Sequence, residues 1–182
     1  MRDQGRALVR IIIAGLVVAC APATVPAQQT GQPGGAPGGA RPCDLAAYRQ
    51  FDFWVGEWEV RAQGRTAGSN SVQRILDGCV IFENWTGAGG GTGKSFNFFN
   101  SATGKWQQTW VDSGGRVLEL VGEAHAGGMR FAGESLTREG RRVMHRLIFT
   151  ALAGDRVRQL WEQSRDGGQT WSVAFDGEYL RK

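Results

Sequence analysis

Residues that could carry catalytic or metal-binding chemistry are few in this sequence. Its 182 residues include two histidines, His125 in a turn beside Gly127 and His145 within an apolar stretch. They do not form a cluster with the spacing of a metal site. No serine stands in the strained strand-to-helix turn that exposes a catalytic nucleophile. We therefore predict no metal and no organic cofactor, since haem would depend on His145 alone.

Polar side chains next to large aromatic residues are the stronger chemical feature. Gln108 lies two residues from both Trp106 and Trp110, so in a strand all three side chains share one face. An interior lined by aromatic rings with a few polar groups is typical of a small-molecule pocket. The residues that we expect to line this pocket are Trp54, Trp85, Trp106, Gln108, Trp110, Arg146 and Trp161.

A carboxylate paired with an arginine would instead favour an enzyme. Glu83 and Arg146 are the candidates, with the carboxylate as a general base whose pKa burial would have to raise. Charged residues in antiparallel strands more often face solvent, because side chains alternate between the two faces of a sheet. We therefore assign no catalytic residue and expect a binding protein rather than an enzyme.

The elements that must position these residues are short strands. From Phe51 onward, turn signals rich in Gly, Asn and Asp separate stretches of alternating apolar and polar residues. Strands are expected at 53–62, 71–76, 79–85, 94–100, 105–112, 117–123, 129–136, 142–152, 156–163 and 171–181. Only 44–50 has helical character. Antiparallel strands without crossover helices avoid exposed edges by closing on themselves. The prediction is an all-β, antiparallel, up-and-down β-barrel of about eight to ten strands.

Two other motifs are assigned structural roles. The glycine-rich segment 87–93 leads into a strand and not into a helix, so we interpret it as a loop at the barrel mouth and not as a phosphate loop. The segment 164–171 (SRDGGQTW) matches the Asp-box hairpin motif of sialidase propellers. A propeller needs several copies, so this single copy predicts a stabilised hairpin.

The first 27 residues are typical of a signal peptide. A basic region at 1–10 precedes an apolar run at 11–21, which is too short to span a bilayer. Cleavage after Ala27 would release a periplasmic or secreted protein. The alternative is lipidation of Cys20, because the residues before it resemble the lipobox of bacterial lipoproteins, and this would anchor the protein to a membrane.

A flexible linker and one domain follow the signal segment. Residues 28–42 are rich in Gly and Pro with little apolar bulk, so we expect a disordered linker, and 43–182 form the barrel domain. Two cysteines, Cys43 and Cys79, remain for an oxidising compartment. We expect a disulfide between them, the alternative being two buried free thiols.

The two ends of the expected barrel resemble the calycin superfamily, which includes the lipocalins. Gly56 and Trp58 form a Gly-x-Trp motif in the first strand, and Arg181 lies in the last. In calycins such a tryptophan closes one end of the barrel, and a basic residue of the last strand covers its ring. The resemblance implies structural roles for these three residues and a lipocalin-like fold.

A longer set of motifs resembles a family of exported bacterial proteins of uncharacterised function. The set comprises FDFWVGEW at 51–58, LDGC at 76–79, WQQTWVD at 106–112 and FDGEY at 175–179. It extends over 51–182, nearly the whole domain. It implies a lipocalin-like fold and adds no activity.

Charge gives little guidance to partners. The net charge is +4, and no run of five or six like charges occurs, so nucleic acid is not an expected partner. The prediction is an exported, lipocalin-like barrel that binds a small apolar or amphipathic ligand. The alternatives are a structural envelope lipoprotein with a packed barrel and an enzyme that uses the Glu83–Arg146 pair. The sequence does not set the oligomeric state.

Overall fold

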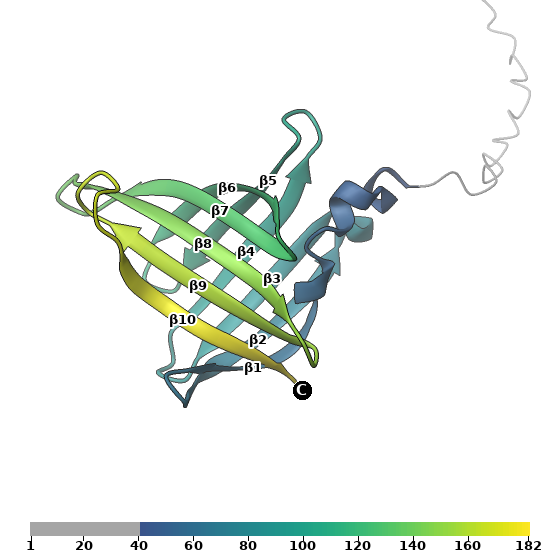
Figure 1. Ribbon diagram of the computed structural model, residues 1–182, viewed down its shortest axis with the longest axis horizontal. Helices are drawn as coiled ribbons and strands as arrows, with labels where there is room; N and C mark the ends of the chain where they lie inside the picture. Colours follow the sequence, from purple (N-terminus) through teal and green to yellow (C-terminus); the bar gives the residue numbers. More distant parts are fainter. Residues whose placement is uncertain (1–40) are drawn as a thin grey trace, which may run out of the picture. The chain divides into compact units, whose positions relative to one another are not determined.

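The structure of the protein is a computed structural model that describes residues 41–182. The expected signal segment, with Cys20, and nearly all of the linker lie outside the described residues. Residues 41–182 contain ten strands (Figure 1): β1 (Gly56–Ala62), β2 (Arg65–Ile75), β3 (Val80–Gly87), β4 (Thr92–Asn100), β5 (Lys105–Asp112), β6 (Val117–His125), β7 (Gly128–Leu136), β8 (Arg142–Leu152), β9 (Arg156–Ser164) and β10 (Ser172–Arg181).

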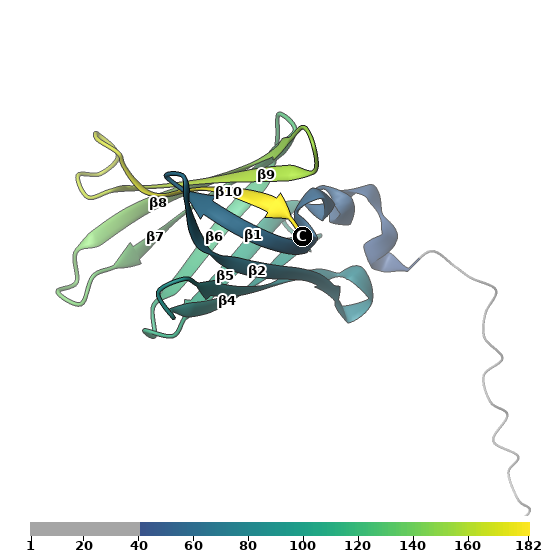
Figure 2. The same cartoon turned by 90° about the horizontal axis from the view of Figure 1, so that it is seen from below.

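The strands form one closed barrel. Each pairs antiparallel with its neighbours in sequence, and β1 pairs with β10 to complete the ring. The predicted all-β, up-and-down barrel is therefore confirmed. Loops that follow odd-numbered strands lie at one end, called here the open end. The other end, called the plugged end, carries the remaining loops and the N-terminal turns, as Figure 2 shows near the C-terminus.

Alternation along each strand separates the lumen from the outer surface. In β8, Val143, His145 and Leu147 are buried, whereas the intervening Met144 and Arg146 are only partly covered. This is the period of two that a strand with one face on the core must have. The register therefore decides which polar residues enter the lumen.

Two boundaries differ from the sequence prediction by three residues or more. The first strand begins at Gly56, because Asp52–Trp54 form a 3-10 turn (η3) that carries aromatic rings into the barrel. The second strand begins at Arg65, six residues before its expected start, since its first half is polar and lacks the apolar alternation used to find it. The segment with helical character forms two short 3-10 turns, η1 (Pro42–Asp44) and η2 (Ala46–Arg49).

Aromatic side chains from the N-terminal segment fill the plugged end. Phe51 and Trp54 stack with centroids 4.9 Å apart, and neither is exposed. Phe149 packs against both, at 5.0 and 4.8 Å, and Trp106 meets Phe51 edge to face. The N-terminal turns thus act as a stopper that completes the core at this end.

The Gly-x-Trp motif and the last strand meet beside this stopper. The guanidinium of Arg181 lies over the ring of Trp58, 4.4 Å from its centroid, as the calycin resemblance implies. A Cβ on Gly56 would stand 2.2 Å from Nη1 of Arg181, so only glycine leaves room for this contact. The predicted disulfide is present and joins Cys43 in η1 to Cys79, immediately before β3.

Candidate functional site

The half of the barrel nearer the open end contains a cavity of about 180 Å³, called here the inner cavity. A larger cleft of about 700 Å³, the mouth cleft, shares Trp85, Trp110, Leu118 and Trp161 with it and extends to the loops of the open end. The inner cavity is therefore reached from the open end. Its lining residues are Glu83, Trp85, Gln108, Trp110, Leu118, Leu147, Gln159, Trp161, Ala174, Phe175 and Tyr179.

Glycines on the inner face of the barrel make room for the aromatic rings of this cavity. The three ring–glycine pairs are Trp85 over Gly68, Trp110 over Gly93 and Phe175 over Gly177. A Cβ on Gly93 would stand 2.1 Å from Cζ2 of Trp110 and within 2.9 Å of two further ring atoms. The ring therefore lies across the backbone of the neighbouring strand and leaves the lumen open.

The floor of the cavity is a chain of hydrogen bonds that ends on a carboxylate. Asn70 Nδ2 donates to Glu83 Oε1, and Ser95 Oγ donates to Glu83 Oε2, both at 2.7 Å. Asn97 Nδ2 donates to Ser95 Oγ at 2.8 Å, and Gln108 Nε2 donates to Asn97 Oδ1 at 2.6 Å. These residues come from β2, β3, β4 and β5, so four strands fix the position of one carboxyl group.

The Glu83 carboxyl is buried without a cationic partner among residues 41–182. Burial raises its pKa to about 7, although the hydrogen bonds from Ser95 and Asn70 act in the opposite direction. Burial and the nearby Glu83 charge also raise the pKa of Tyr179 well above its usual value. The Glu83 carboxyl therefore changes its charge near neutral pH, and such shifted pKa values are typical of functional sites.

One acceptor of the floor has no donor. The side-chain oxygen of Asn70 is buried and makes no hydrogen bond within the described part of the chain. Tyr179, whose hydroxyl would be a donor, instead donates to Gln159 Oε1 at 2.5 Å. One acceptor next to the Glu83 carboxyl therefore remains without a donor among residues 41–182.

A serine and a histidine lie together in the mouth cleft, but their hydrogen bonds argue against a nucleophile. Ser135 Oγ is 2.7 Å from Nε2 of His145, and Trp161 Nε1 donates to Nδ1 of the same ring at 3.1 Å. A neutral imidazole that accepts at Nδ1 must carry its proton on Nε2 and donate it to the serine. Burial, followed by the charge of Arg165, lowers the pKa of His145, which favours this neutral form.

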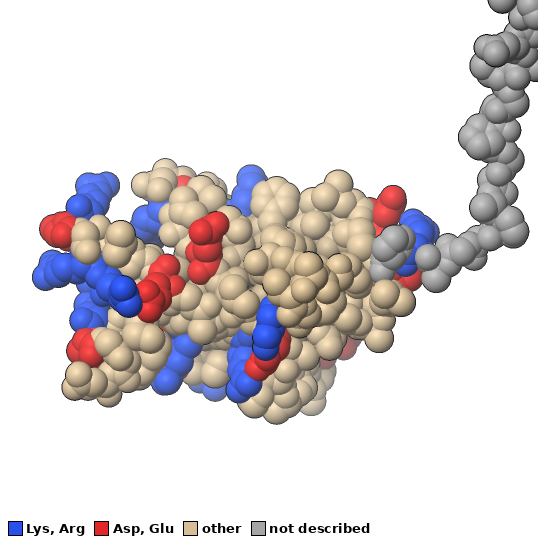
Figure 3. All heavy atoms as spheres, turned by 90° about the horizontal axis from the view of Figure 1, so that it is seen from above, with Lys and Arg blue, Asp and Glu red and all other residues tan. Residues whose placement is uncertain are grey.

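Arginines border the mouth cleft. Arg116 pairs with Asp112 at 2.7 Å, whereas Arg138 and Arg165 make no ion pair within residues 41–182. Figure 3 shows Lys and Arg side chains gathered at the end where the β7–β8 and β9–β10 loops lie. The entrance is therefore positively charged, although no cationic side chain lines the inner cavity.

The structure separates the expected pocket residues into three groups. Trp85, Gln108, Trp110 and Trp161 line the inner cavity. Trp54 belongs to the stopper at the plugged end, Trp106 of β5 packs against it, and neither lines the inner cavity. Arg146 lies on the outer surface. No Glu83–Arg146 pair is formed, because the two side chains are on opposite faces of the barrel wall.

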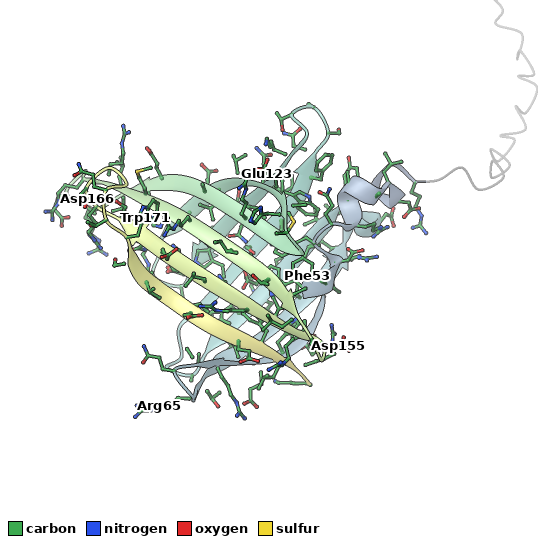
Figure 4. The ribbon with its side chains drawn as sticks, in the orientation of Figure 1. Phe53, Arg65, Glu123, Asp155, Asp166 and Trp171 are labelled. Atoms are coloured by element: carbon green, nitrogen blue, oxygen red, sulfur yellow. A yellow bond between two sulfur atoms is a disulfide. The ribbon has the colours of Figure 1, made fainter. Side chains whose placement is uncertain are left out.

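Arg146, on the outer face of β8, instead contacts residues of β9 and of the β9–β10 loop. It makes two hydrogen bonds to Glu162, at 2.6 and 3.0 Å, and its guanidinium lies 4.2 Å from the ring centroid of Trp171. Asp166 accepts from the backbone and hydroxyl of Thr170. Figure 4 shows Asp166 and Trp171 together at this loop. The SRDGGQTW segment is thus a hairpin, as expected.

Several site residues were not selected from the sequence. Gln159 lies on β9, two residues before Trp161 and on the same face. Phe175 and Tyr179 lie on β10, after a β-bulge between Val173 and Phe175 that shifts the register. Parity from Trp161 could have found Gln159. A bulge breaks the alternation of faces along a strand, so alternation could not predict that Phe175 faces the cavity.

The fold and the cavity define a closed up-and-down β-barrel, an architecture compatible with a ligand-binding protein of the calycin type. No protein-family model and no curated protein matches the sequence. Among the described residues, no helix has the length and apolar character that crossing a bilayer requires. The same residues contain no group of three or more His, Cys, Asp or Glu side chains placed to hold a metal ion.

Proposed function

We propose that this protein is an exported, calycin-like barrel that binds a small apolar or amphipathic molecule in the inner cavity. The observation that carries the proposal is the cavity itself, with tryptophan rings on its wall and hydrogen-bonding groups on its floor. Such a combination is typical of small-molecule sites in the mouths of barrels. The disulfide supports an oxidising, exported location.

The structure favours this function over the two alternatives. A packed structural barrel needs a filled lumen, but aromatic packing fills only the plugged end. The enzyme hypothesis needs Glu83 and Arg146 on the same face, and they lie on opposite faces. Ligand binding requires neither a filled lumen nor a Glu83–Arg146 pair.

Native mass spectrometry of the protein expressed with its own signal tests the proposal directly. A small molecule that is retained in the native spectrum and lost on denaturation would support it. The same spectrum reports the N-terminus that was made, including a lipid on Cys20. A protein that retains no molecule and binds none from a panel of apolar and amphipathic compounds would contradict it.

A variant that fills the cavity gives the matched test. Leu118 lines both the inner cavity and the mouth cleft, so Leu118→Trp should block access and weaken ligand binding at least tenfold, at a cost of about 1–3 kcal/mol in stability. The control is Val121→Trp, because the Val121 side chain on the same strand is 51% exposed and lines neither the inner cavity nor the mouth cleft. Tryptophan fluorescence titration measures both. Equal binding by the two variants would place the ligand elsewhere.

A further inference from the structure

The titratable groups of the inner cavity are both acidic. Its lining contains two titratable side chains, Glu83 and Tyr179, and no Lys, Arg or His. Ionised Glu83 is therefore the one full charge on this wall. A carboxylate removed from water without a counter-ion is unfavourable, so a buried one is normally paired. In this site the described residues supply hydrogen bonds to the carboxylate and no opposite charge.

The floor also has unused hydrogen-bond acceptors. A carboxylate has about four lone-pair positions, and Glu83 uses two of them for Asn70 and Ser95. The side-chain oxygen of Asn70 is buried with no donor from residues 41–182. Of these two residues Glu83 lines the inner cavity, so a ligand group that uses its free lone pairs must bring donors or positive charge.

Aromatic rings surround the space above this floor. Trp85 and Phe175 meet edge to face with centroids 6.2 Å apart, and Trp110 and Trp161 complete the wall. The rings of Trp85 and Trp110 cover glycines of adjacent strands, so they lie along the wall. The faces of aromatic rings attract cations, and several rings around one position form a cage for organic ammonium groups.

We propose that the inner cavity binds the ammonium group of an organic cation, held between the tryptophan rings and the Glu83 carboxylate. The inference rests on the proposed function and specifies its ligand class. The cavity volume of about 180 Å³ is sufficient for a methylated ammonium group, since a cavity of about 150 Å³ holds benzene. Charge, unused acceptors and aromatic lining all point to the same chemistry.

The mouth cleft restricts the remainder of the ligand. Arg138 and Arg165 lie where the outer part of a bound molecule would extend. They repel a second positive charge and tolerate a neutral or anionic substituent. The expected ligand therefore carries its only cationic group at the inner end.

Choline and 3,3-dimethyl-1-butanol provide the test, because they have the same shape and differ in one positive charge. We expect choline to bind roughly tenfold more tightly at pH 8, measured by tryptophan fluorescence or calorimetry. Glu83→Gln should lower this preference severalfold, because only the rings then attract the cation, and should keep the affinity for the neutral alcohol. Glu119→Gln, on the outer face of β6, is the matched control and should behave as the unsubstituted protein.

Choline has no titratable amine, so its pH dependence reports on the protein. We expect its affinity to weaken about tenfold between pH 8 and pH 5.5 as Glu83 is protonated. Tyr179 faces the same cavity, and His145, Arg138, Arg165 and the Asp112–Arg116 pair face the mouth. Loss of the pH effect in Glu83→Gln separates Glu83 from these groups.

The outcomes distinguish this inference from the proposed function. If the neutral alcohol binds as tightly as choline, or if only neutral and anionic compounds bind, the ammonium inference is wrong and the ligand-binding function stands. If no small molecule binds at all, both are wrong. Should Glu83→Gln fail to fold, the comparison of choline with the alcohol and its pH dependence in the unsubstituted protein still decide.

Discussion

Glu83 couples the stability of the barrel to pH. Its folded-state pKa is about 7 and its ordinary value is 4.5. Below pH 4.5 the carboxyl is neutral in both folded and unfolded chains, so it causes no penalty. Between pH 4.5 and about pH 7 the folded chain holds the proton more tightly than the unfolded chain, so the stability of the fold decreases as pH rises. Above pH 7 the loss is complete, at about 3 kcal/mol.

Glu83→Gln should remove this pH dependence. The variant keeps the shape of the side chain and cannot ionise. Between pH 5 and pH 8 its free energy of unfolding should therefore fall by about 3 kcal/mol less than that of the unsubstituted protein. Urea denaturation at the two pH values measures the difference, with Glu119→Gln as the exposed control. Parallel curves for Glu83→Gln and the unsubstituted protein would contradict a buried, unpaired carboxylate.

Gly93 holds the cavity open. Its alanine variant would bring a Cβ within 2.1 Å of the Trp110 ring, so the ring must move into the lumen. We expect Gly93→Ala to lose about 1–3 kcal/mol of stability and to bind any ligand of the inner cavity more weakly. Gly91→Ala is the matched control, because a Cβ there meets nothing within 4 Å. Urea unfolding and fluorescence titration of both variants provide the comparison. Identical behaviour of the two variants would show that Gly93 is not needed to hold the Trp110 ring against the wall.

At the scale of the elements, turn residues and alternation predicted most of the barrel. Both ends of the strands at 105–112 and 142–152 agree with the structure, because clear turn signals flank regular apolar alternation. The first half of β2 was missed because its inward positions are Gly68 and Asn70, which serve the Trp85 ring and the Glu83 carboxyl. Local patterning does not show such roles, since the residues that explain them lie on another strand.

The stopper at the plugged end depends on the Cys43–Cys79 disulfide, which closes a loop of 36 residues. Removing it with Cys43→Ser and Cys79→Ser together should cost about 3–4 kcal/mol by the loop-entropy relation. Thermal or urea unfolding of this variant, compared with the unsubstituted protein before and after reduction, measures the effect. Because the inner cavity lies toward the open end, ligand affinity should be unchanged in the folded variant. Unchanged stability would mean that the bond does not restrain the unfolded chain.

For the molecule as a whole, the barrel is divided into a packed half and a hollow half. Closure was predictable, because ten sequential strands without helices leave no other way to remove exposed edges. The placement of the tryptophans was only partly predictable. Trp54 and Trp110 have similar sequence contexts, yet one fills the stopper and the other the cavity wall. The two tryptophans differ in location because Trp54 belongs to the 3-10 turn before β1, whereas Trp110 lies over Gly93 of the neighbouring strand. Both causes depend on three-dimensional packing and not on the local sequence.

The seam between β1 and β10 has a consequence for how the chain folds. Arg181 reaches the carbonyl of Val55 across 126 residues of sequence, so the ring is complete only when β10 pairs with β1. Contacts of such long range form slowly, and until they form, β1 and β10 expose unpaired edges. The contact of the Arg181 guanidinium with the Trp58 ring therefore forms only when the first and last strands come together.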